Sequence, residues 1–133
     1  MALIASAASP GDTLRQEVLI DGRHRLVTDE PVELGGTDEG ATPQELVAGA
    51  LAACVATTIR VWMRRRAWNI GELRVDVRYD QTATPCEVEI NVHLPEVSDE
   101  QRVRVLAAIR ACRVRKSIEG GMHFHERLIE DMH

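Results

Sequence analysis

The segment that begins at Thr42 constrains the fold of this chain more than any other part of the sequence. Thr42 offers a hydroxyl N-cap, Pro43 suits the first helical position, and Glu45 completes a capping box, so a helix is predicted to begin here. The run LVAGALAACVATTI that follows is apolar or small on every side of that helix and ends before Arg60. Because it is shorter than a bilayer-spanning segment and rich in alanine, it predicts a core helix that is buried all round.

A helix with no polar face needs more cover than a single sheet provides in a chain of 133 residues. Either a second layer of the same chain or a partner subunit must enclose it. We therefore expect an intertwined homodimer with the two buried helices at its centre. The helix should leave the core at the basic run 64–66, whose positive charges suit a helix C-terminus.

Composition places the chain among ordinary globular proteins, because apolar residues make up 44% and charged residues 28% of it. Its length suits a single domain over residues 1–133, with residues 1–12 as a candidate flexible N-terminal segment. A net charge of −5 and an aromatic content of 3% argue against nucleic-acid binding, which needs a basic surface and stacking platforms.

The N-terminus and the cysteines indicate the cellular compartment. Residues 1–10 lack the basic start and the long apolar stretch of a signal peptide. The 3 cysteines are too few and too far apart for a secreted disulfide scaffold, and no C-x-x-C pair occurs. We expect a soluble cytoplasmic protein, without a membrane partner, whose cysteines rest as thiols.

Two antiparallel hairpins are predicted, one on each side of the long helix in the sequence. The first joins residues 13–20 to residues 24–28 through the tight turn at 21–22. A glycine-rich loop over residues 29–41 leads from this hairpin to the helix. The second hairpin joins two runs of alternating apolar residues through the turn-rich stretch 80–85. Those runs are Leu73, Val75, Val77 and Tyr79, and Val88, Ile90, Val92 and Leu94.

A second, amphipathic helix is predicted after the second hairpin, where Ser98 and Gln101 form a capping box. Its one-sided stripe is Val103, Leu106, Ala107, Ile109, Arg110 and Cys112. The tail from His123 to Met132 is a candidate for a last strand. This order of elements predicts an α+β fold in which antiparallel sheets pack on the long central helix and the second helix.

Cys54 and Cys112 are the residues most able to carry chemistry. Cys54 lies inside the apolar helix, and from its neighbours alone it is a small, inert core residue. Cys112 precedes the cations Arg113, Arg115 and Lys116, which would lower its pKa, whereas a helix C-terminus would raise it. Spacing alone leaves both interpretations open.

Two other features are interpreted as structural. Cys86 stands beside Pro85 in a turn and is interpreted as incidental. His123 and His125 would share one face of a strand, with His133 nearby in sequence. Structural metal sites usually need four protein ligands, and no cysteine or histidine cluster completes this set, so no metal is predicted.

The sequence from Gly35 to Cys54 resembles the signature of the OsmC/Ohr family; it reads GGTDEGATPQELVAGALAAC, with VATTIRVWMRRR after it. That signature is a glycine loop, a Thr-Pro helix start and an alanine-rich helix that bears the peroxidatic cysteine. A second run, ACRVRKSI from Ala111 to Ile118, resembles the family's segment around its resolving cysteine. The resemblance covers roughly residues 29–118 and implies the OsmC-like fold.

This resemblance implies thiol-dependent reduction of organic hydroperoxides. Cys54 falls on the peroxidatic position and would attack the O–O bond as a thiolate, which releases an alcohol and leaves a sulfenic acid. Cys112 falls on the resolving position and would condense with that sulfenic acid to a disulfide. An external dithiol, in the family a lipoyl group or another dithiol, would restore both thiols, and no bound cofactor is implied.

The sequence departs from the family pattern before the first cysteine. In the best-characterised branches an acidic residue stands ten positions before this cysteine and pairs with an activating arginine, and here that position is Gln44. Glu45 is the candidate replacement, and its alternative role is the capping box with Thr42. The activating arginine would come from the first hairpin, as Arg25 or Arg23, with Arg25 favoured.

The sequence therefore predicts a homodimeric, OsmC-like thiol peroxidase that reduces organic hydroperoxides and protects against oxidative stress. Two alternatives stay open. The chain would be a thiol sensor if it formed the same disulfide without catalysis. It would be a small-molecule binding protein if it kept the fold without the chemistry.

Overall fold

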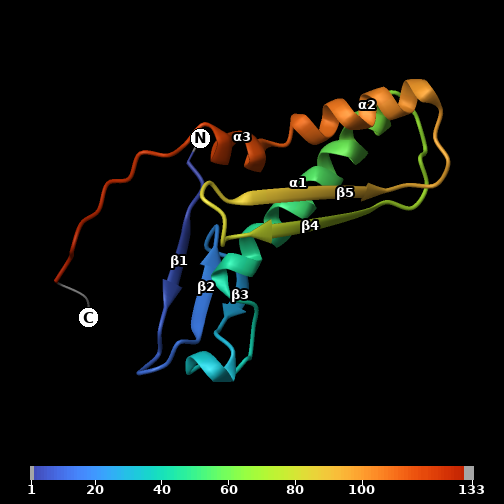
Figure 1. The fold of residues 1–133 in the computed structure, drawn as a ribbon. Helices are drawn as coiled ribbons and strands as arrows, with labels where there is room; N and C mark the ends of the chain where they lie inside the picture. Colours follow the sequence, from blue (N-terminus) through green and yellow to red (C-terminus); the bar gives the residue numbers. More distant parts are fainter. Residues whose placement is uncertain (1, 131–133) are drawn as a thin grey trace. The chain divides into compact units, whose positions relative to one another are not determined.

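The computed structural model describes residues 2–130. The chain divides into two compact units, Met1–Gly49 and Ala50–His133. Within the described residues the elements are two antiparallel sheets and three α-helices, shown in Figure 1. The fold class is therefore α+β, as the order of elements predicts.

The first unit holds a three-stranded sheet of order β1-β2-β3, with β1 at Ala5–Ala8, β2 at Gln16–Ile20 and β3 at His24–Thr28. The predicted hairpin is confirmed as β2 and β3, because Ile20 pairs with His24 across a turn in which Asp21 and Gly22 have positive φ. β1 lies in the segment expected to be flexible. Its sequence ASAA has little strand propensity, so pairing with the edge of β2 decides its conformation.

A buried carboxylate organises the glycine-rich loop that follows β3. Asp29 is 1% exposed and accepts hydrogen bonds from the hydroxyl of Thr37 at 2.7 Å and from the backbone N–H groups of Glu30, Thr37 and Glu39. The hydrogen bond from the hydroxyl of Thr37 lowers the pKa of the Asp29 carboxyl, and the backbone donors lower it further. Burial raises this pKa, but the hydrogen bonds outweigh it, so the pKa falls from 3.8 to about 2. Gly36 packs so closely on the carbonyl of Glu30 that a Cβ would collide with it. The sequence explains the glycines of this loop only as turn formers.

Replacing Asp29 by Asn should lower the melting temperature at neutral pH by several degrees, because an amide cannot accept all of these hydrogen bonds. The carboxylate has a depressed pKa in the folded protein, so its contribution is complete above about 4 and is lost as the pH falls towards about 2. The melting temperatures of the wild-type protein and of Asp29→Asn should therefore approach each other as the pH falls through that window. Asp38→Asn is the control, since Asp38 lies in the same loop with positive φ, which Asn tolerates. Equal melting temperatures for the wild-type protein and Asp29→Asn would contradict this role.

The long helix α1 spans Pro43–Arg65, and its predicted start is confirmed. The N–H of Thr42 donates to Glu45 Oε1 at 2.8 Å, and the N–H of Glu45 donates to Thr42 Oγ1 at 3.1 Å. The prediction of burial all round is wrong for the single chain, which covers one stripe of the helix. That stripe is Leu51, Val55, Ile59 and Met63, at intervals of four residues.

By length and composition alone, α1 could cross a bilayer. Core helices of soluble proteins meet the same criterion, and Val55, Ile59 and Met63 of α1 belong to the hydrophobic core cluster of the second unit. The core cluster of the second unit joins three residues of this stripe to Ile70, to the helix over residues 99–110 and to Cys112, two residues beyond the end of that helix. Its members are Val55, Ile59, Met63, Ile70, Val105, Ala108 and Cys112.

The second unit contains the second predicted hairpin, with β4 at Arg74–Asp80 and β5 at Glu87–His93. The two strands pair antiparallel, as predicted, and Val77 lies opposite Ile90 and Tyr79 opposite Val88. Along β4 the half-buried residues alternate with exposed ones, so one face of the hairpin packs on the core.

Helix α2 spans Asp99–Arg110 and begins at the predicted capping box, where Ser98 and Gln101 exchange hydrogen bonds. The predicted stripe is wrong in part, since Val103 is 65% exposed and Leu106 is 50% exposed, while Val105 and Ala108 are buried. The helix is rotated relative to the predicted stripe because the face that continues to Cys112 packs on α1.

The chain after α2 differs from prediction in two places. Arg113–Glu119 forms a short helix, α3, that the sequence analysis does not predict. The predicted last strand is absent from residues 121–130, which adopt no regular secondary structure; Met132 lies outside the described residues. Within residues 2–130 no strand pairs with this tail. A weak alternation of apolar and polar residues does not hold a strand in place without such pairing.

Candidate thiol site

The second unit brings Cys54 and Cys112 together. Cys54 is half-buried on α1 and packs against the core cluster, and Cys112 is a fully buried member of that cluster. Cys54 is one residue before the buried Val55, so it lies at the edge of the covered stripe. Both cysteines are free thiols, close enough for their side chains to hydrogen-bond.

The surroundings of Cys54 favour its thiolate. Burial by itself would raise the pKa of this thiol, but the hydrogen bond from Cys112 and the backbone N–H groups of Val114 and Arg113 outweigh it, so the pKa of Cys54 is lowered. Thr58 adds a further donor one turn along α1, and its hydroxyl also donates to the carbonyl of Cys54 at 2.8 Å. The fully apolar neighbourhood expected from sequence is therefore incomplete.

The pKa of Cys112 is shifted in the opposite direction. Burial is the main reason that its pKa is raised, and donation of its hydrogen to Cys54 raises it further. The expected lowering by neighbouring cations is wrong, because Cys112 is sealed in the core while Arg113 and Lys116 are exposed. Cys54 is therefore the more acidic of the two thiols, and Cys112 is the one that donates its hydrogen.

Helix α3 supplies the part of this site that the sequence analysis misses. Cys112 is the N-cap residue of α3, with φ −54° and ψ 124°, and α2 has already ended at Arg110. The first N–H groups of a helix have no partner within it, so those of Arg113 and Val114 are free to donate to the sulfur of Cys54, which lowers its pKa. The glycines at 120–121 are the available signal for this helix, because they mark where it ends.

A family model described as OsmC-like protein matches residues 36–127. The chain belongs to the OsmC-like family. The match includes both cysteines and the loop-to-helix segment on which the resemblance depends. Among curated proteins, no sequence matches this chain.

Solved structures share the OsmC-like fold. A Psychrobacter arcticus protein assigned to the osmotic stress and detoxification response is 26% identical, with a TM-score of 0.72 over 84% of this chain and 85% of that one. The organic hydroperoxide resistance protein OsmC of Legionella pneumophila is 23% identical, with a TM-score of 0.66 over 90% of both chains. An organic hydroperoxide resistance protein of Elizabethkingia anophelis is 23% identical, with a TM-score of 0.65 over 90% of this chain and 89% of that chain.

The other predicted site residues of this OsmC-like protein have separate surroundings. Glu45 is engaged in the capping box, which confirms that alternative, and its pKa is lowered by the N–H and hydroxyl of Thr42. Arg25 is exposed on β3, and Arg23 pairs with Asp21 at 3.3 Å. These residues belong to the first unit, so their catalytic roles stay predictions.

The remaining thiol and the histidines lie outside this site. Cys86 is exposed and accepts a contact from the Tyr79 hydroxyl at 4.0 Å. His123 and His125 are exposed in the irregular tail, so the strand that would have aligned their rings is absent there. Across residues 2–130 no group of three or more histidine, cysteine or acidic side chains has the arrangement of a metal site.

Alkylation of this OsmC-like protein should distinguish the two thiols. Because the pKa of Cys54 is lowered and that of Cys112 is raised, Cys54 should react with iodoacetamide at a lower pH than free cysteine, and Cys112 at a higher pH. Alkylation rates measured by peptide mapping across a pH series give the inflection in reactivity for each thiol. Cys112→Ala removes the donor and should move the Cys54 inflection upward, whereas Cys86→Ser should leave it in place. An inflection for Cys54 at or above that of free cysteine would contradict the assignment.

Proposed function

We propose that this protein reduces organic hydroperoxides through Cys54 and Cys112. The observation that carries the proposal is the asymmetric thiol pair, in which the half-buried Cys54 has a lowered pKa and the buried Cys112, which donates to it, has a raised pKa. Membership of the OsmC-like family, together with relatives named for hydroperoxide resistance, supports a role in redox or peroxide stress.

The proposed cycle balances with the two thiols and one external reductant. The Cys54 thiolate attacks the outer peroxide oxygen, the O–O bond breaks, and the alkoxide leaves as the alcohol after taking a proton, so Cys54 becomes a sulfenic acid. The thiol of Cys112 then displaces hydroxide from that sulfur, which releases water and forms a disulfide. A dithiol reduces this disulfide by thiol exchange and is itself oxidised.

The surroundings of the pair favour a peroxide with an apolar group. Val55, Ile59 and other aliphatic residues of the core cluster lie beside the two sulfurs. A strongly hydrated peroxide without an apolar group would therefore gain little binding free energy there. No resident cofactor is needed, because the sulfurs hold the electrons in transit. A lipoyl group or another dithiol would serve as the reductant, in the cytoplasm, where both thiols start reduced.

Intact mass after a short exposure of the reduced protein to one equivalent of cumene hydroperoxide tests this proposal. The expected product has lost two hydrogens, and peptide mapping should place the bridge between Cys54 and Cys112. Cys54→Ser should lose the reaction, whereas the matched control Cys86→Ser should keep it. Thiols that oxidise no faster than free cysteine would overturn the peroxidase, and a fast disulfide without turnover on added dithiol would make the protein a sensor instead.

We further propose that the protein works as a homodimer that covers the exposed side of α1. Ala50, Ala53, Thr57 and Val61 are exposed in the single chain, on the side of the helix opposite its buried stripe. They are small or apolar, and a second copy would remove them from water without having to bury a charge.

A charge on this side of α1 should therefore prevent dimer formation. Thr57→Glu would place an unpaired carboxylate in the interface, which should weaken association about 100-fold or more. Sedimentation across a range of concentrations measures the change. Val103→Glu, at an exposed apolar position of α2, should leave association unaltered. A monomeric wild-type protein at high concentration would refute the dimer.

A further inference from the structure

Thr58 carries a hydroxyl one turn beyond Cys54 on α1, next to two acceptors of the same residue. Its Oγ1 donates to the carbonyl oxygen of Cys54 at 2.8 Å. Side chains four residues apart on a helix are neighbours, and the Thr58 hydroxyl is also among the donors to the Cys54 sulfur. A hydroxyl has one hydrogen, so the carbonyl and the sulfur compete for it.

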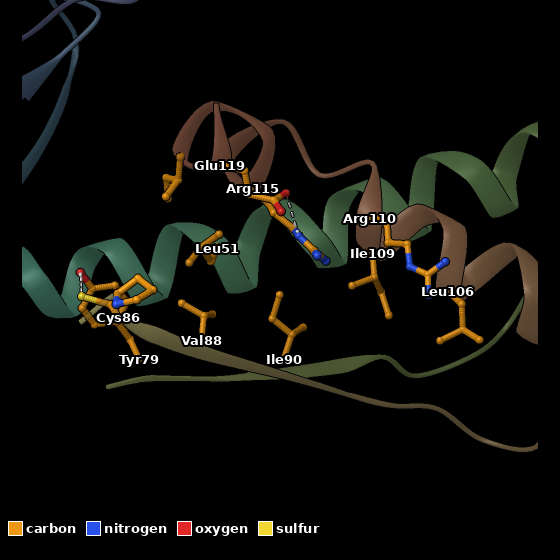
Figure 2. Close-up of a pocket in the computed structure, with 12 residues that line it drawn as sticks. Leu51, Tyr79, Cys86, Val88, Ile90, Leu106, Ile109, Arg110, Arg115 and Glu119 are labelled. Atoms are coloured by element: carbon orange, nitrogen blue, oxygen red, sulfur yellow. Dashed lines mark hydrogen bonds and ion pairs between the residues drawn. The ribbon is translucent and has the colours of Figure 1, made fainter. Parts of the chain in front are cut away.

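Helix α3 lies over this side of α1. Figure 2 shows Arg115 and Glu119 of α3 above Leu51, which precedes Cys54 by three residues. Thr58 is half-buried, and Cys54 packs against the core cluster. A hydrogen bond in such surroundings is stronger than one in water, so the choice between the two acceptors has an energetic consequence.

The charged groups around Cys54 are few. Helix α1 carries no charged side chain between Glu45 and Arg60. The β4–β5 hairpin packs on the core cluster through apolar side chains, and Arg115 of α3 is paired with Glu119 at 3.1 Å. The state of the Cys54 sulfur is therefore set by its hydrogen bonds.

The donors to this sulfur differ in their freedom to turn. Within residues 2–130 they are the N–H groups of Arg113 and Val114, the thiol of Cys112 and the hydroxyl of Thr58. Of these groups only Cys112 titrates, and the backbone fixes the direction of the two N–H groups. The hydroxyl hydrogen turns about the Cβ–Oγ bond while its oxygen stays in place. Thr58 can therefore change its acceptor without moving a heavy atom.

The charge on Cys54 decides which acceptor is favoured. A thiol sulfur is a weak acceptor, so the carbonyl holds the hydrogen while Cys54 is protonated. Hydrogen bonds to ionised groups are roughly twice as strong as neutral ones, so a thiolate draws the hydrogen from the carbonyl. The carbonyl lies inside α1 and keeps the helical hydrogen bond from the N–H four residues on, so it is not left unpaired.

We propose that Thr58 is a hydrogen-bond switch for the nucleophile. Its hydroxyl donates to the carbonyl of Cys54 while the sulfur is a thiol, and to the sulfur when it becomes a thiolate. The inference rests on the proposed function, in which this thiolate attacks the peroxide. The hydrogen stays on the Thr58 oxygen throughout, and the proton that Cys54 releases goes to solvent. Once the attack removes the charge from the sulfur, the hydrogen returns to the carbonyl.

Thr58→Val tests the switch, because it removes the hydroxyl and keeps the shape of the side chain. In alkylation by iodoacetamide the Cys54 inflection should move up by about 0.5–1 pH unit, and the rate at neutral pH should fall about three- to tenfold. The rate at high pH should not fall, because Cys54 is then ionised in both proteins, whereas a displaced sulfur would lower it. Thr58→Ser should restore the wild-type inflection, and Thr58→Ala should behave as Thr58→Val.

Thr57→Val is the matched control for this measurement. It makes the same change one residue earlier, on the exposed side of α1, and keeps that side apolar. The Cys54 inflection should stay in place. An unchanged inflection in Thr58→Val and Thr58→Ala, or an equal shift in Thr57→Val, would overturn the inference.

The change of acceptor is observed in the carbonyl resonance of Cys54. Cys54 and Val55 are the only Cys-Val pair in the sequence, so carbonyl-¹³C cysteine with ¹⁵N valine gives one amide–carbonyl correlation. This carbonyl resonance should move upfield as the pH rises through the inflection, because its carbon becomes more shielded when the hydrogen bond is lost. Thr58→Val lacks that bond at every pH and should show a much smaller change. Equal changes in the two proteins would contradict the switch.

The switch and the peroxidase can fail independently, since neither alkylation nor the carbonyl resonance involves a peroxide. A shifted inflection in Thr58→Val, with no turnover of cumene hydroperoxide by the wild-type protein, leaves the switch and removes the peroxidase. Turnover by the wild-type protein with an unshifted inflection in Thr58→Val does the reverse.

Discussion

The packing of α1 against the end of α2 is the contact on which the thiol chemistry depends. Val55, Ile59 and Met63 are at most 1% exposed, and they pack with Val105, Ala108 and Cys112 in one cluster. Burying aliphatic side chains of this size contributes about 1.5–3 kcal/mol each, which fixes the position of α1 on its partners. Since Cys54 is next to Val55, the same packing fixes its sulfur beside Cys112.

The difference in acidity between the two thiols follows from burial at Cys112 and from hydrogen bonds at Cys54. Cys112 is sealed in the core, which raises its pKa, whereas Cys54 reaches the edge of the core, where the N–H groups of α3 lower its pKa. The causes that lower the pKa of Cys54 are hydrogen bonds, two of them from backbone N–H groups. Backbone donors are fixed by the fold and are less easily lost by substitution than a side-chain cation.

The sequence predicts the parts of this fold that depend on local patterns. The capping boxes at Thr42 and Ser98 locate two helix starts, and alternating residues locate the hairpins with the correct partners. The sequence does not predict the features that depend on contacts between residues far apart in the chain. The pairing of β1 depends on the edge of β2, and the rotation of α2 depends on which face meets α1. The position of Cys112 before a helix, rather than at the end of one, requires a break after Arg110 that no glycine or proline marks.

Helix α3 has 7 residues, fewer than an isolated helix needs to persist in water. It therefore exists only while its neighbours hold it, and within residues 2–130 it has no fully buried side chain of its own. Each transient unwinding of α3 withdraws the N–H groups of Arg113 and Val114 from the sulfur of Cys54. The acidity of this thiol is thus an average over folded and frayed states of a neighbouring segment, so anything that orders or loosens residues 113–119 adjusts the nucleophile from outside the site.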